Sequence, residues 1–96
     1  GFMHVRDGGY CGERGELLST EVSGADACAA LAQGAGAQSF LLGIWFRRGY
    51  CYAGVMTVDT AQYEAWEGER VDPACPTEWV NSMIFDFYAI EPLAED

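Results

Sequence analysis

The sequence predicts a small, mostly antiparallel α+β domain, and three observations support this fold class. The length of 96 residues is enough for one compact domain and too short for a second core. The expected elements follow in the order strand, helix, two strands of a hairpin, helix and strand, so most neighbouring strands are antiparallel. Four widely spaced cysteines are typical of small domains held by two disulfides, and they are Cys11, Cys28, Cys51 and Cys75.

The chain is expected to divide into a short lead segment, one domain and a tail. Residues 1–9 are rich in glycine and are predicted to be irregular. Residues 10–91 are predicted to form the single domain, and residues 92–96 an acidic tail. The first expected strand covers residues 16–22, where polar side chains recur at alternate positions.

The main helix is predicted over residues 25–33, which are rich in alanine. Ser23 and Asp26 resemble a capping box at its start, and the glycines of residues 34–36 are expected to end it. Positions that recur at helical spacing are expected to point Cys28 toward the core, and they are Ala27, Cys28, Leu31 and Ala32.

A central hairpin follows this helix. Residues 40–46 are apolar on both faces, which predicts a strand that is covered on each side. Residues 47–49 are expected to form a tight turn, and residues 50–53 to return as the partner strand.

The last third of the chain predicts a second short helix and a closing strand. The helix is expected over residues 60–68, followed by a loop over residues 71–76 that two prolines fix, and then by a helical turn over residues 77–80. The closing strand covers residues 83–90. One face is expected to carry Phe85, Phe87 and Ala89, and the other Ile84, Tyr88 and Ile90, with Asp86 as a polar intrusion.

Composition excludes several classes of partner. The chain has 15 acidic residues against 5 basic ones, all arginine, and a formal charge of −10, which disfavours binding to nucleic acid or to anionic lipid. Its longest apolar run, residues 40–46, is too short for a transmembrane segment. Two disulfides would place the protein in an extracytosolic oxidising compartment, either secreted or in an organelle lumen such as the thylakoid lumen. Four cysteines allow three pairings, and spacing alone does not choose between them.

The arrangement of helix, cysteines and hairpin resembles a PAN/apple-like domain over residues 10–91. The resemblance rests on a helix cysteine in residues 26–32, a strand that opens at Ser39, the hairpin sequence of residues 49–52 and the apolar closing strand. It implies a curved antiparallel sheet packed by one main helix. It also implies the disulfides Cys28–Cys51 and Cys11–Cys75. Two departures are a missing second helix cysteine and a longer stretch over residues 54–81.

No residue pattern predicts catalysis, a cofactor or a metal site. The single histidine, His4, lies in the glycine-rich lead segment and is expected to be a solvent-exposed bystander, so it offers no nucleophile–base pair. An acidic cluster could attract Ca²⁺, but its spacing does not match an EF-hand loop and a solvated helix face explains it better. Its members are Glu64, Glu67, Glu69 and Asp72.

The strongest functional signal is aromatic. Four aromatic residues flank two adjacent arginines on the central hairpin, and both residue types are enriched at binding hot spots. The predicted partner-binding residues are Trp45, Phe46, Arg47, Arg48, Tyr50 and Tyr52. The alternative is that these aromatic rings fill the two faces of the sheet. Trp66 and Trp79 are expected to cover the sheet.

We therefore predict a non-catalytic protein-interaction module or small accessory subunit that docks on a protein partner or larger assembly. Two alternatives remain open. One is a peripheral lumenal subunit of a photosynthetic membrane complex (a photosystem) of an alga, because the chain has no sequon and no lysine and is acidic. The other is a carbohydrate-binding module, in which Trp or Tyr would stack on sugar rings. The start at Gly1 fits either a processed mature protein or a domain of a longer chain.

Overall fold

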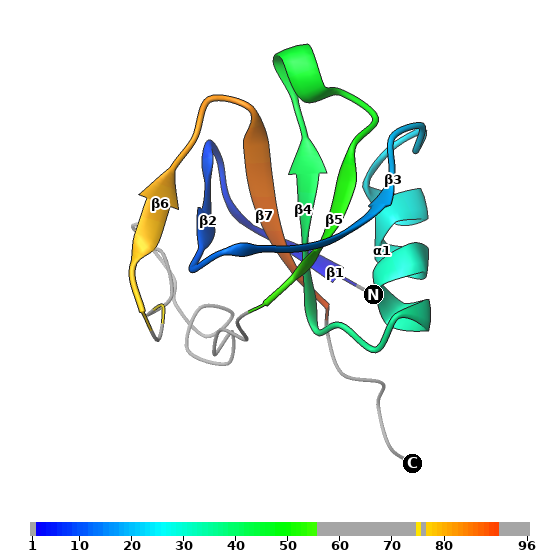
Figure 1. The fold of residues 1–96 in the computed structure, drawn as a ribbon, viewed down its shortest axis with the longest axis horizontal. Coiled ribbons are helices and arrows are strands. Elements are labelled where there is room, and N and C mark those ends of the chain that lie inside the picture. The colour runs from blue at the N-terminus through cyan, green and yellow to red at the C-terminus, as the bar shows by residue number, and fades with distance from the viewer. Residues whose placement is uncertain (1, 56–74, 76, 91–96) are drawn as a thin grey trace.

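The computed structural model of the chain describes residues 2–55, 75 and 77–90. These residues form strands, one α-helix and a short 3₁₀ helix, η1 (Figure 1). Their bounds are β1 Phe2–Arg6, β2 Gly9–Cys11, β3 Arg14–Ser19, α1 Ala25–Gly34, β4 Ser39–Gly43, η1 Trp45–Arg47, β5 Cys51–Gly54, β6 Trp79–Asn81 and β7 Phe85–Ile90.

A five-stranded sheet organises the fold. Its strands lie in the order β1-β7-β4-β5-β3, and every neighbouring pair is antiparallel. A separate antiparallel pair, β2 and β6, lies to one side of this sheet, and α1 lies to the other (Figure 1). The prediction of a small α+β domain with antiparallel sheets is therefore confirmed. The predicted second helix over residues 60–68, the acidic cluster and the tail of residues 92–96 fall outside the described residues.

The prediction that residues 1–9 are irregular is wrong. Residues 2–6 form edge strand β1, which pairs with β7, and the chain then turns into β2. Of the glycines that suggested irregular structure, Gly8 lies in this turn, with a φ of +66° that a residue with a Cβ rarely adopts, and Gly9 begins β2. The predicted helical turn over residues 77–80 is also wrong, because residues 79–81 form β6 and pair with β2.

Helix α1 follows the predicted range, with two corrections. The predicted capping box is not formed, because the N-cap is Gly24 and no side chain caps the helix. Leu31, expected in the core, is 41% exposed, since the buried stripe runs through Cys28, Ala29 and Ala32. The carboxyl end is closed by Gly36, whose positive φ of 80° accompanies hydrogen bonds from the backbone N–H groups of residues 36 and 37 back into the last turn.

Strand β4 ends earlier than the predicted strand over residues 40–46. The chain leaves the sheet after Gly43, because the backbone of Arg47 folds back over this glycine. A Cβ at residue 43 would lie only 1.8 Å from the Arg47 carbonyl oxygen. Residues 45–47 consequently form η1 instead of extending β4, and the connection to β5 is longer than the predicted tight turn.

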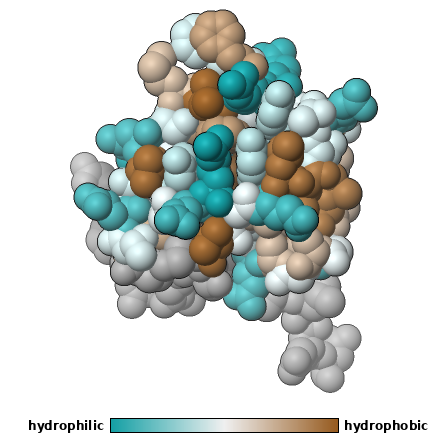
Figure 2. Space-filling model, in the orientation of Figure 1, coloured by the Kyte–Doolittle hydropathy of each residue, from teal (hydrophilic) through white to brown (hydrophobic). Residues whose placement is uncertain are grey.

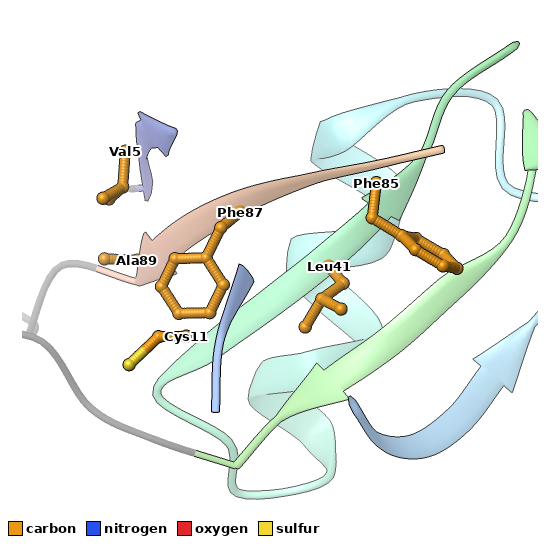
Figure 3. Close-up of a cluster of buried hydrophobic side chains, with 6 residues drawn as sticks. All are labelled: Val5, Cys11, Leu41, Phe85, Phe87 and Ala89. Atoms are coloured by element: carbon orange, nitrogen blue, oxygen red, sulfur yellow. The ribbon is translucent and has the colours of Figure 1, made fainter. Parts of the chain in front are cut away.

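Two hydrophobic clusters cover the two faces of the sheet. The helix-face cluster contains the disulfide Cys28–Cys51 and has Cys28, Ala29, Ala32, Phe40 and Cys51 as its buried members. The other cluster lies under the two-stranded ribbon of β2 and β6 and is here called the ribbon-face cluster. Figure 3 shows its buried members, which are Val5, Cys11, Leu41, Phe85, Phe87 and Ala89. The disulfide Cys11–Cys75 joins this second face.

Both disulfide pairings implied by the resemblance are therefore present. The two predicted faces of the closing strand are confirmed for five of its six apolar residues: Phe85, Phe87 and Ala89 belong to the ribbon-face cluster, and Tyr88 and Ile90 pack on the helix face. Ile84 differs, since it packs against the ribbon-face cluster.

Within the described part of the chain, no helix is both long enough and apolar enough to cross a bilayer.

Candidate functional site

The β4–β5 connection carries an exposed cluster of aromatic and basic side chains, here called the aromatic tip and defined as residues 45–48. Trp45 is 57% exposed and Phe46 is 73% exposed. Their rings stack on each other with centroids 4.4 Å apart. Arg47 and Arg48 follow directly and are also exposed. Figure 2 shows this end of the molecule projecting at the top, with hydrophobic and hydrophilic side chains next to one another.

The backbone holds the aromatic tip in place. Gly43 donates its N–H to the Tyr50 carbonyl at 2.8 Å, and Tyr50 donates to the Arg47 carbonyl at 2.9 Å. Ile44 donates to the carbonyl of Ile84 at 2.8 Å, which ties the connection to the start of β7. These bonds pair backbone N–H and C=O groups of a segment that leaves the sheet, so the exposed rings are attached to an ordered backbone.

Trp45 has an unusual backbone conformation. Its φ of 53° lies in the left-handed region, which is uncommon for bulky residues and costs free energy. Such backbone strain concentrates at functional positions, where the surrounding structure maintains it. The observation therefore singles out Trp45 within the aromatic tip.

The six predicted partner-binding residues separate into two groups. Trp45, Phe46, Arg47 and Arg48 are exposed together, whereas Tyr50 and Tyr52 are half-buried and pack against the ribbon-face cluster. Tyr52 meets the ring of Phe85 edge to face at 5.3 Å, which is a core contact. Arg47 connects the two groups, because its guanidinium lies 5.4 Å from the Tyr50 ring centroid.

The expectation that Trp79 covers the sheet is confirmed. It is half-buried, and its ring meets that of Phe87 edge to face at 5.4 Å. The guanidinium of Arg6 lies over the Trp79 ring, 5.1 Å from its centroid. Trp66 falls outside the described residues.

A second group of chemically active side chains was not predicted, and it is here called the His4 cluster: His4, Asp7 and Asp86. The Nε2 atom of His4 lies 3.0 Å from Oδ1 of Asp7 and 3.6 Å from Oδ2 of Asp86. The His4 side chain is 31% exposed, so it is half-buried and the predicted full solvent exposure is wrong. The reason is that β1 pairs with β7 and sets His4 opposite Tyr88, on whose ring it stacks at 4.7 Å.

The β-strands and the turn between β1 and β2 fix the geometry of the His4 cluster. A β-bulge between His4 and Arg6 shifts the register against β7, a feature that often marks functional sites. Asp86 is only 14% exposed, and its Oδ1 accepts a hydrogen bond of 2.7 Å from the N–H of Gly8. The sequence signal for this group was Asp86 itself, a carboxylate within an otherwise apolar strand.

The carboxylates of the His4 cluster act on the neighbouring tyrosine. Burial, followed by the negative charges of Asp86 and Asp7, raises the pKa of Tyr88 above its usual value of 10.0. The cluster therefore concentrates negative charge at the edge of the sheet. Three side chains with metal-ligating atoms lie together there.

Comparison of the chain with known protein families, characterised proteins and solved structures finds no match.

Proposed function

We propose that this chain is a non-catalytic protein-interaction module with a PAN/apple-like build, which docks on a protein partner through its aromatic tip. The observation that carries this proposal is the stacked, exposed pair Trp45 and Phe46. Exposed aromatic side chains on an ordered backbone remove a large area from water on binding at a small cost in conformational entropy. The disulfides are compatible with a role outside the cytosol, either secreted or in an organelle lumen.

The chemistry of the aromatic tip indicates the chemistry of its partner. The chain carries a formal charge of −10, yet two of its five arginines stand directly beside the exposed rings. A matching partner surface has an apolar pocket for Phe46 and Trp45, with carboxylates at its rim for Arg47 and Arg48. Paired charges at such a rim set orientation and the rate of association more than affinity.

The test is a binding measurement with matched variants. The oxidised chain is immobilised and used to isolate partners from the source organism, and a purified partner is then titrated by calorimetry. The double variant F46A/R48A should weaken binding at least about tenfold, because aromatic and arginine side chains dominate hot spots. The control is L31A, which removes an apolar side chain 41% exposed on α1 and should leave the affinity unchanged.

The melting temperature of F46A/R48A should stay within a few degrees of the parent value, since both side chains are exposed. Equal affinity of the parent and F46A/R48A would refute the proposal. Binding to a glycan array that depends on Trp45 would support the carbohydrate alternative instead. Recovery only within a detergent-solubilised membrane complex would favour the lumenal-subunit alternative, and the same variants then test whether the aromatic tip makes that contact.

A further inference from the structure

We propose that the His4 cluster is a binding site for a divalent transition-metal ion, with Zn²⁺ as the best fit. The three potential ligand atoms come from His4, Asp7 and Asp86 and all lie within 4.8 Å of one another. They come from β1, from the turn that follows it and from β7, so the site depends on the pairing of two strands distant in sequence. It lies apart from the aromatic tip and does not depend on the function proposed above.

The distances suit one shared ion. Zn²⁺ bonds of about 2.0–2.2 Å to nitrogen and oxygen place neighbouring ligand atoms of a tetrahedral site about 3.3–3.6 Å apart. The separation of 3.0 Å from His4 Nε2 to Asp7 is slightly below this range, and the separation of 3.6 Å to Asp86 is at its upper end. All three ligand atoms lie within 4.8 Å of one another, and the Asp7 side chain, which is 83% exposed, can turn toward a shared ion.

The other two ligands are already oriented. The Gly8 N–H holds Oδ1 of Asp86, while Oδ2 of the same carboxylate is the atom near His4. The His4 ring stacks on Tyr88, and the Tyr88 ring stacks in turn on the buried Phe40 at 4.9 Å. Contacts that orient metal ligands in this way raise the affinity of a site, and their loss typically costs 10–100-fold.

The ligand set discriminates between ions. One imidazole nitrogen and two carboxylates suit Zn²⁺, whereas Ca²⁺ prefers six to eight oxygen ligands. Three protein ligands leave a fourth tetrahedral position for water. Thiolates do not compete for the ion, because all four cysteines are in disulfides.

The experiment is a titration of the full oxidised chain with Zn²⁺ at pH 7.5, followed by calorimetry and by ¹⁵N NMR of the imidazole. His4 is the single histidine, so its ring nitrogens give an unambiguous signal. We expect one equivalent of Zn²⁺ to bind and to shift the Nε2 resonance far more than the Nδ1 resonance. Ca²⁺ at the same concentrations should leave both resonances in place.

Three variants remove one ligand each. H4F keeps a ring to stack on Tyr88, D86N keeps an oxygen for the Gly8 N–H, and D7N changes a side chain that is 83% exposed. Each should weaken Zn²⁺ binding at least about tenfold. The control is E16Q, which removes one exposed carboxylate from β3 at the opposite edge of the sheet and should leave the affinity unchanged.

The outcomes distinguish a defined Zn²⁺ site at the His4 cluster from nonspecific attraction of Zn²⁺ to an acidic surface. Unchanged affinity in H4F and D7N, equal losses in E16Q and D7N, or no shift at Nε2 would each overturn the proposal. If H4F or D86N fails to fold, D7N together with the NMR signal of the parent chain decides the question. Loss of the partner contact in F46A/R48A with intact Zn²⁺ binding would show that the two sites are independent.

Discussion

The two faces of the central sheet are built in different ways. On the helix face the buried residues of α1 include two small side chains, Ala29 and Ala32, which belong to the same cluster as Phe40 and allow α1 to pack closely on the sheet. On the ribbon face the buried volume comes from Phe85 and Phe87, and two short strands cover it. Each face has one disulfide, with a sequence separation of 23 on the helix face and 64 on the ribbon face.

The two faces differ in how far apart in the sequence their segments lie. Helix α1 directly precedes β4, the strand that it covers, so neighbouring segments complete the helix face. The ribbon face is complete only when β2 and β6 pair, although residues 9–11 and 79–81 lie at opposite ends of the chain. Closing such a long loop costs conformational entropy, and a disulfide lowers that cost by restricting the unfolded chain.

The largest expected effect is the loss of the disulfides. Chain-entropy estimates assign about 4 kcal/mol to Cys11–Cys75 and about 3.5 kcal/mol to Cys28–Cys51. Because the net stability expected for such a domain is roughly 5–10 kcal/mol, reduction of both should unfold it. Urea unfolding followed by circular dichroism, with and without reductant, measures this loss.

Two double variants then compare how much stability the disulfide on each face contributes. C11A/C75A should lose more stability than C28A/C51A if loop closure dominates. The reverse order would show that packing of the buried sulfurs under α1 matters more, since both Cys28 and Cys51 are fully buried. Cysteines replaced in pairs avoid leaving a free thiol in either variant.

The next effect tests packing by opposite changes in side-chain size. F87A empties the centre of the ribbon face and should cost about 3–5 kcal/mol, because Phe87 is fully buried. A32L adds volume where α1 meets the sheet and should cost about 1–3 kcal/mol. Both are measured as free energies of unfolding in urea. A harmless A32L would contradict the close approach of the helix.

A smaller effect appears only at alkaline pH. Burial, with Asp86 and Asp7, raises the folded-state pKa of Tyr88 above the value of 10.0 expected in the unfolded chain. The corresponding stability is fully present below pH 10.0 and is lost as the pH rises through the folded-state pKa. Stability curves from pH 8.5 to about 11 should therefore be flatter for Y88F than for the parent chain.

Two comparisons make the alkaline experiment specific. Y10F changes a half-buried tyrosine of the ribbon face and should leave the contribution of Tyr88 in place. D86N removes one of the two carboxylates that raise the folded-state pKa of Tyr88, so the loss of stability above pH 10.0 should be smaller and should end at lower pH than in the parent chain. If stability falls with pH at the same rate in Y88F and in the parent chain, the alkaline loss does not come from Tyr88.

The smallest effect concerns the aromatic tip, which belongs to neither face. Trp45 has a positive φ, so W45G should be more stable than W45A by about 0.5–1 kcal/mol, because only glycine adopts this conformation without a steric penalty. Thermal unfolding of the two variants measures the difference. Greater stability of W45A would show that the left-handed backbone is not a source of strain.

The helix face was largely predictable from the sequence. Alanine-rich content and helical spacing located α1 to within a residue, and the apolar run of residues 40–46 located its partner strand. The disulfide pairings came from the resemblance, because spacing alone left three open. The aromatic tip was predicted because adjacent arginines interrupt an aromatic hairpin, but Tyr50 and Tyr52 turned out to face the core.

The ribbon face and the His4 cluster were not predictable in this way. Glycines at residues 8 and 9 obscured the strands on either side of them, and a three-residue strand such as β6 is too short to show a periodic pattern. The contacts of His4 with Asp86 span 82 positions, so no local motif records them. Such contacts arise from strand pairing and bulges, which depend on the whole sheet.

The bond between Cys11 and Cys75 also determines what a protease can do to this protein. Cleavage anywhere within residues 56–74 would give two polypeptides that stay covalently joined, because each retains one of these half-cystines. The amino-terminal piece would keep β1 to β5, and the carboxyl-terminal piece would contribute β6 and β7 as before. A nicked form would therefore migrate as a single species until a reductant is added.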